Sequence, residues 1–243
     1  MNRRILVVSV LLSAVGCSSV AFAIAPLGPP TASLAKGQFG LSAEYAYSDS
    51  DWEISLGDNE ATLEGVVSNV FLAQLGYGLT DDWEIYVPLG VAEHETADYK
   101  FAYGLGTKLT FEKVNDWSWG LLFEIGWRSG EDSGTVDFSE FGLGVVNAEV
   151  DFSYYDITVA LGPTWKVAEG IRLYGGPFFY VLEGDVDYEI TGLGDLSLDL
   201  GEKSLFGGYI GAELDICPNS SWYGEFQLTG DMMVFGTGIS WKF

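Results

Sequence analysis

Residues 117–128 read WSWGLLFEIGWR, and this stretch decides the fold. Large apolar side chains occupy every second position: Trp117, Trp119, Leu121, Phe123, Ile125 and Trp127. The opposite side carries small, polar or charged residues: Ser118, Gly120, Glu124, Gly126 and Arg128. A period of two residues predicts a β-strand with one apolar face and one polar face.

Nine further segments of about ten residues repeat this alternation between residue 38 and the C-terminus. They predict an all-β chain, but a soluble β-sandwich alternates in the same way, so the connections must decide the environment. Four connections are tight: 80–82, 113–116, 168–170 and 217–220. The interleaved connections 49–65, 129–150 and 183–203 are long, and 93–98 and 230–231 are short.

Tight turns at one end and mostly long loops at the other are typical of an outer-membrane barrel. We therefore predict a transmembrane antiparallel up-and-down β-barrel of about ten strands, with eight as the alternative, and place the short turns and both termini in the periplasm. The 15% aromatic residues, 32 glycines and net charge of −24 suit aromatic girdles, close strand packing and acidic loops. No later apolar run approaches the ~18 residues that a membrane helix needs.

The first residues predict a secretory signal peptide. Residues 1–4 are positively charged, residues 5–15 are apolar, and AFA at 21–23 predicts cleavage after Ala23. The alternative is lipidation of Cys17, because residues 14–18 resemble a lipobox. The expected organisation is a signal peptide (1–23), a short periplasmic N-terminal segment (24–37) and a barrel with acidic extracellular loops (38–243).

Inward positions carry charges of both signs, which we call the lumen charge layer: Glu84, Lys108, Glu112, Glu124, Lys166, Arg172, Glu213, Asp215, Glu225 and Lys242. Side chains just fill a barrel of about eight strands, so ten strands predict a largely plugged lumen. Because an unpaired buried charge is costly, we expect these charges to pair. The alternative is a narrow conduction path for small solutes, gated by the same layer.

The acidic residues gather in the long loops, and we call six of them the acidic rim: Asp49, Asp51, Glu53, Asp137, Asp185 and Asp187. Three similar loop pieces, 51–54, 136–139 and 186–189, predict hairpins that continue the strands beyond the bilayer. A negative rim repels nucleic acid and attracts divalent cations or a basic surface partner. No EF-hand spacing is present, and no cofactor or resident metal is expected.

His94 is the only histidine in the chain and stands at the predicted extracellular end of its strand. Barrel enzymes generally need a histidine that works with a carboxylate or a serine. No Gly-x-Ser-x-Gly motif or metal-binding His pair accompanies it. We therefore expect no enzyme, and an enzyme at the membrane surface that uses His94 is an alternative.

The chain ends ISWKF at 239–243, an alternating strand that closes on an aromatic residue. It resembles the signal by which Gram-negative outer-membrane barrels are handed to the barrel-assembly machinery, with Trp241 and Phe243 at its key positions. Residues 77–85, YGLTDDWEI, resemble a strand-turn-strand motif of outer-membrane transport barrels.

The resemblance extends to small OmpA-like, opacity-protein-like and OpcA-like barrels, which differ in function, so it implies fold and location in the cell outer membrane more than activity. The implied partners are the lipid bilayer and the assembly machinery. The expected function is a structural or surface-interaction role with a largely plugged lumen. A small cation-preferring porin is the first alternative, and the surface enzyme is the second.

Overall fold

The computed structural model describes residues 25–56, 59–94, 100–138, 144–190, 194–202 and 205–243. Their strands are β1 (Phe39–Leu56), β2 (Asn59–Thr80), β3 (Trp83–His94), β4 (Lys100–Val114), β5 (Trp117–Phe138), β6 (Gly144–Ala168), β7 (Ile171–Ile190), β8 (Gly194–Glu202), β9 (Phe206–Cys217), β10 (Ser220–Leu228) and β11 (Met232–Lys242). Within the described ranges, no helix is long and apolar enough to cross a membrane. The predicted signal peptide (1–23), its cleavage point and the alternative lipidation site Cys17 lie outside the described residues.

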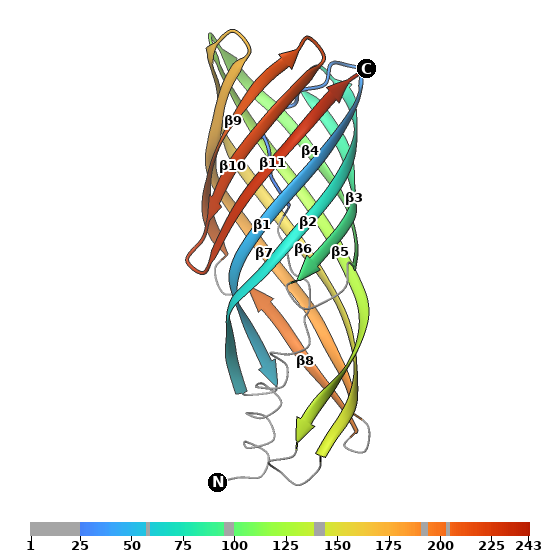
Figure 1. The fold of residues 1–243 in the computed structure, drawn as a ribbon. Helices are drawn as coiled ribbons and strands as arrows, with labels where there is room; N and C mark the ends of the chain where they lie inside the picture. The colour runs from blue at the N-terminus through green and yellow to red at the C-terminus, as the bar shows by residue number, and fades with distance from the viewer. Residues whose placement is uncertain (1–24, 57–58, 95–99, 139–143, 191–193, 203–204) are drawn as a thin grey trace.

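The strands form one closed antiparallel barrel (Figure 1). Each strand from β1 to β7 pairs with the next, β7 pairs with β9, and β11 pairs with β1 from Gly40↔Lys242 to Ser50↔Met232. Because β8 lies outside this ring, ten strands close it. The prediction of ten strands is confirmed, and the alternative of eight is wrong.

Three hairpins continue beyond the ring and form what we call the extension, at the lower end of Figure 1. They are β1 with β2, β5 with β6, and β7 with β8. In the extension β8 pairs with both β7 and β1. It therefore connects these two strands beyond the ends of β9, β10 and β11. The predicted continuation of the strands as hairpins is confirmed for the described residues.

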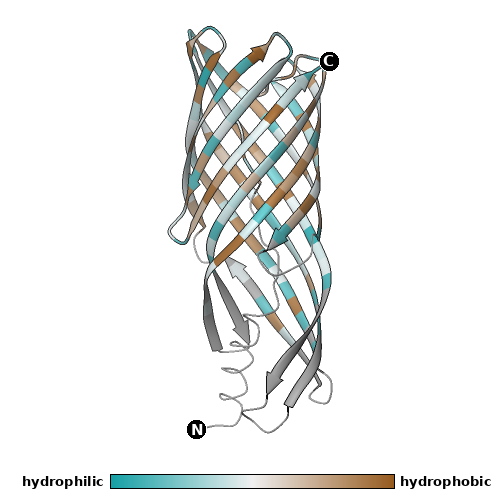
Figure 2. Ribbon diagram, in the orientation of Figure 1, coloured by the Kyte–Doolittle hydropathy of each residue, from teal (hydrophilic) through white to brown (hydrophobic). Residues whose placement is uncertain are grey.

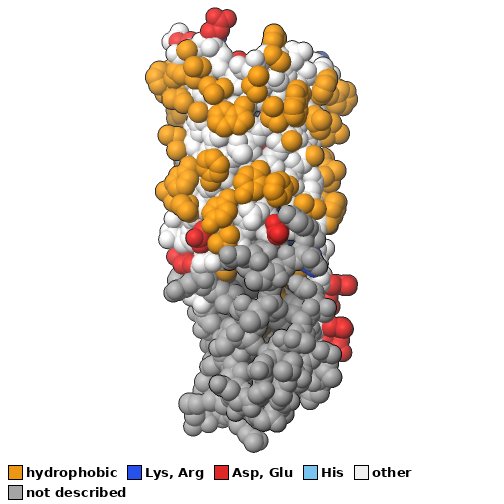
Figure 3. Space-filling view, viewed as in Figure 1, with side chains coloured by type: hydrophobic (Ala, Val, Ile, Leu, Met, Phe, Trp, Pro, Cys, Tyr) orange, Lys and Arg blue, Asp and Glu red, His pale blue; other side chains and the backbone are white. Residues whose placement is uncertain are grey.

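The outer face of the ring is apolar. Large side chains such as Phe101, Phe111 and Ile210 are more than half exposed. Apolar side chains cover much of this part of the barrel on the face shown in Figure 3, and the strands alternate in hydropathy (Figure 2). A closed ring satisfies every interior backbone group of the sheet, which is the condition for β-strands to cross lipid. With its apolar face outward, this ring is a transmembrane β-barrel of the outer-membrane type.

Residues 25–35, which we call the lumen segment, lie inside the barrel. Ala25, Leu27 and Leu34 are 5 to 7% exposed, and Ala25 packs in a cluster with Val70 and other apolar residues of the wall. The sequence analysis expected this stretch outside the barrel in the periplasm, and the structure corrects that location. The physical reason is that the side chains of ten strands leave a space along the axis, which the segment fills.

Glycines of the wall make room for the lumen segment. A Cβ added at Gly120 would lie 2.5 Å from the carbonyl oxygen of Pro30, and one at Gly78 would lie 2.1 Å from that of Ala35. Any larger residue at these positions would collide with the backbone of the segment. These glycines therefore leave space for the lumen segment and also allow close packing of the strands.

Candidate functional site: the lumen and its N-terminal segment

Glu225 on β10 holds one end of the lumen segment. Its two carboxylate oxygens accept hydrogen bonds from the backbone N–H groups of Leu27 at 2.6 Å and Gly28 at 2.8 Å. Gln227 donates to Glu225 at 2.7 Å and to the carbonyl oxygen of Ala25 at 3.2 Å. All these groups are buried, so the bonds form away from competing water.

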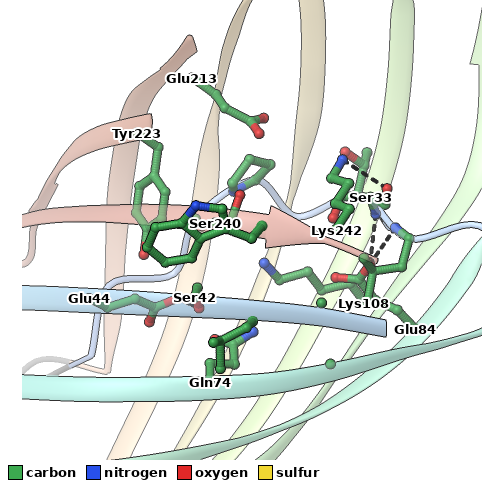
Figure 4. Close-up of a pocket in the computed structure, with 18 residues that line it drawn as sticks. Ser33, Ser42, Glu44, Gln74, Glu84, Lys108, Glu213, Tyr223, Ser240 and Lys242 are labelled. Carbon is green, nitrogen blue, oxygen red and sulfur yellow. Dashed lines mark hydrogen bonds between the residues drawn. The ribbon is translucent and has the colours of Figure 1, made fainter. Parts of the chain in front are cut away.

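Glu84 on β3 holds the other end in the same manner (Figure 4). Its Oε2 accepts from the backbone N–H groups of Ser33 at 2.7 Å and Leu34 at 3.0 Å. Lys242 on β11 donates from Nζ to the carbonyl oxygen of Ser33 at 3.0 Å. Charges on the wall are therefore matched to backbone dipoles of the segment at both ends.

Two threonines on the wall contact the middle of the segment. Thr110 Oγ1 accepts from the N–H of Ala32 at 2.9 Å, and Thr164 shares a hydrogen bond of 3.0 Å with Thr31. Together with the two glutamates, these contacts come from β3, β4, β6 and β10, which lie around the ring. The segment is thus held on several sides.

A cavity of about 70 Å³ remains between the lumen segment and the wall. Figure 4 shows Glu44, Lys108, Gln74 and Tyr223 around it. Its volume is enough for a few water molecules. Beside the lumen segment, little free space therefore remains between the segment and the described side chains of the wall.

The predicted lumen charge layer divides into three groups. Glu84, Glu124, Glu213 and Glu225 are buried; Lys108, Arg172 and Lys242 are half-buried; Glu112, Lys166 and Asp215 are exposed near the tight turns. Pairing occurs at Arg172, which contacts Glu213 at 2.9 Å and also Asp215. For Glu84 and Glu225 the expected charge pairing is wrong, because their acceptors are used by backbone N–H groups of the lumen segment.

The sequence analysis left the strongest buried ion pair out of the layer. Arg128 on β5 bonds to Asp156 on β6, and both side chains are at most 5% exposed. The guanidinium also lies 5.6 Å from the ring centroid of Tyr154. The alternation of 117–128 puts Arg128 on the polar face, and Asp156 lies between the apolar residues Tyr155 and Ile157, but only the pairing of β5 with β6 makes the two charges neighbours.

The acidic rim lies partly on the outer face of the extension. Asp185 and Asp187 are exposed, whereas Val186 between them is buried. Across the strands Asp187 faces Asp151, and Asp185 faces Asp199. Figure 3 shows acidic side chains on this part of the surface.

Asp49 and Asp51 of the rim are half-buried, and Asp51 accepts a hydrogen bond of 2.9 Å from the N–H of Gly65. The side chains of Glu53 and Asp137 are outside the described part of the structure. Among the side chains that are described, no three His, Cys, Asp or Glu residues gather as a metal site. Divalent-cation binding at the rim therefore stays a prediction.

The remaining sequence candidates lie at strand ends. Trp241 and Phe243 are 36% and 74% exposed, and the N–H of Phe243 donates to the carbonyl oxygen of Phe39 at 2.9 Å, beside β1. His94 ends β3, and its side chain is outside the described residues. Recognition of Trp241 and Phe243 by the assembly machinery, and the enzyme alternative at His94, both stay predictions.

Comparison with known proteins agrees with the fold. No family model and no curated protein matches the chain. Among solved structures, the outer membrane protease OmpT from Escherichia coli is 10% identical, covers 88% of this chain and 99% of its own, and gives a TM-score of 0.52. The translocator domain of the autotransporter NalP from Neisseria meningitidis is 10% identical, covers 99% of this chain and 96% of its own, and gives 0.50. The predicted resemblance to outer-membrane barrels is confirmed at the level of fold, and with the apolar outer face it places the chain in the outer membrane.

Proposed function

We propose that this chain is a closed outer-membrane barrel that acts through its acidic extension and passes no solute while the lumen segment is in place. The observation that supports closure is the pair of glutamates, Glu84 and Glu225, bound to consecutive backbone N–H groups of that segment. The cavity that remains beside the segment is small. A barrel filled in this way is expected to block the passage of solutes.

The acidic extension supports the surface role. Two carboxylate pairs, Asp151 with Asp187 and Asp185 with Asp199, face each other across neighbouring strands. Like charges directly opposite destabilise a sheet, and a bound cation or basic surface would offset that repulsion. We therefore propose divalent cations or a basic protein surface as the extracellular partner, whereas the same field repels nucleic acid.

A narrow cation-preferring channel is the second candidate. Its support is that residues 25–35 belong to no strand, so the segment can leave the lumen without breaking a pairing of the barrel. In that case Glu84 and Glu225 would both hold the closed state and line the opened path. Their negative charge would favour cations.

Single-channel conductance of the refolded mature protein in a planar bilayer tests closure. The wild type is expected to stay silent, and the Glu84→Gln, Glu225→Gln double variant is expected to show conductance steps, because amide groups replace charged acceptors. Glu213→Gln is the matched control, since Glu213 is buried in the same lumen but bonds to Arg172 and Ser221. Stable cation-selective steps from the wild type would contradict closure and favour the channel.

Titration calorimetry tests the surface role. We expect Ca²⁺ or a lysine-rich peptide to bind the wild type, and Asp185→Asn, Asp187→Asn to weaken that binding. The effect should shrink as salt is added, because exposed charges are screened. Binding that is equal in the wild type and the variant would exclude this face as the site.

We also propose that Trp241 and Phe243 are recognised by the barrel-assembly machinery, on the exposure of both side chains at the end of the chain. Phe243→Ala is expected to reduce the amount of folded barrel in the outer membrane of cells. The same variant refolded in detergent should keep near-wild-type stability, which separates recognition from folding.

A further inference from the structure

Most of the hydrogen bonds that the described wall makes to the lumen segment go to its backbone. Glu225 takes the N–H groups of Leu27 and Gly28, and Glu84 takes those of Ser33 and Leu34. Every peptide carries such N–H groups, so this part of the recognition is not tied to particular side chains. At both ends the wall also donates to a carbonyl oxygen, from Gln227 and from Lys242.

The sequence between the two clamps fits this pattern. Pro29 and Pro30 have no N–H groups, so the stretch between the glutamates needs fewer acceptors from the wall. Gly28 has a φ of 64°, a left-handed conformation that glycine adopts without strain. Successive N–H groups around such a turn form a concavity that suits an anion, and the carboxylate of Glu225 occupies it.

Side-chain contacts add a preference for shape. Leu34 lies against the wall where two glycines leave space, because a Cβ at Gly40 or Gly76 would come within 2.9 or 3.0 Å of its methyl carbons. Pro30 and Leu27 are buried as well. A peptide that turns at a glycine and carries a proline pair with apolar residues on each side matches this lumen.

The covalent link contributes little to these contacts. The segment joins β1 through Lys36 and Gly37, which are exposed at the periplasmic end. Near the link, backbone groups of Gly37 and Gln38 bond to Gly78, Gln38 exchanges hydrogen bonds with Ala35, and the N–H of Lys36 donates to Asp81. None of the contacts made by Glu225 or Glu84 requires that connection, so a separate peptide could make the same contacts with these two glutamates.

We propose that the lumen of this barrel is a binding site for a peptide, and that residues 25–35 are its tethered ligand. Glu225 and Glu84 are the recognition residues. The site goes beyond the closed state proposed above, because a peptide from another molecule would take the same contacts once the segment has left.

The test begins with the complete mature chain, folded before any cut is made. A recognition sequence for a site-specific protease is inserted between Lys36 and Gly37, and the folded barrel is then cleaved. Native mass spectrometry follows how long the freed segment stays with the barrel. A fluorescent synthetic peptide of residues 25–35 is added in excess to measure exchange, and circular dichroism confirms that each variant is folded.

We expect the freed segment to remain bound and to exchange with the labelled peptide. Glu225→Gln and Glu84→Gln should each speed release by about tenfold, because hydrogen bonds to a charged group are stronger than neutral ones. Glu213→Gln should release it at the wild-type rate. A labelled peptide methylated at the backbone nitrogen of Leu27 keeps every side chain but loses one donor, and should bind about tenfold more weakly.

Loss of the segment immediately after cleavage of the wild type would overturn the proposal. Equal release rates in the wild type, Glu225→Gln and Glu84→Gln would overturn it as well, since the segment would then be trapped by shape alone. A different result, conductance by the uncleaved wild type, would refute the proposal that the barrel is closed. The two proposals can therefore be refuted independently.

Discussion

The two faces of the same strands place different demands on the sequence, and β5 shows the contrast. Its outward residues Phe123 and Trp127 contact lipid, where any large apolar side chain serves. Its inward residue Arg128 forms an ion pair with one particular acid, Asp156. The outer face thus requires only that its residues are large and apolar, whereas the inner face requires particular residues that bond to each other. Single substitutions should distinguish the two.

The largest expected effect is on the inner face. Arg128→Met leaves Asp156 buried without its cation and should lower the free energy of unfolding by ~3–5 kcal/mol. The measurement is denaturant unfolding of the refolded protein in lipid vesicles. The double variant Arg128→Met, Asp156→Leu should recover most of the loss, because no unpaired charge remains. A double variant no more stable than the single one would show that the site depends on shape rather than on charge.

The outer face should respond to charge alone. Phe123 lies on β5 between the aromatic residues Trp119 and Trp127, on the lipid side. Phe123→Arg places a cation within the bilayer and should cost about 2–4 kcal/mol of unfolding free energy. Phe123→Leu in the same vesicles is the control and should cost much less. Equal costs for the two variants would contradict a lipid contact at this position.

The smallest expected effect concerns a specific contact on the outer face. Trp117 and Trp165 stack with ring centroids 5.1 Å apart and planes within 2° of parallel, on neighbouring strands. A double-mutant cycle with alanine should give a coupling energy of about 0.5–1.5 kcal/mol. A coupling energy near zero would mean that the two tryptophans contribute to stability only through their apolar surface area and not through stacking.

The strands were predictable because inward and outward positions differ at most steps. The alternation in 117–128 identifies the faces of β5, with inward Leu122 as an exception, and the tight turn 113–116 identifies β4 as one of its neighbours. Less was predictable for the long loops. Residues 194–202 form β8, which pairs with β1 from far along the chain, and no local pattern indicates such a partner.

For the candidate site, the sequence identified Glu84 and Glu225 as inward charges and predicted that they pair with other charges, but it gave no sign that they bind backbone N–H groups. Their acceptors meet Ser33 and Leu27, which are 51 and 198 residues away along the chain. Composition gave no sign of these contacts, because residues 25–35 contain no charge and no strand alternation. A stretch without a pattern was therefore expected to lie outside the barrel.

The sequence by itself determined the fold class, the number of strands in the ring, the lipid-facing residues and the acidic character of the extension. These features follow from a period of two and from local composition, which are properties of neighbouring residues. Only the tertiary structure decided what fills the barrel. A ring of ten strands leaves an axial space, and the polar groups of its wall need hydrogen-bond partners. The lumen segment supplies these partners from a part of the chain that becomes a neighbour of the wall only after the ring has closed.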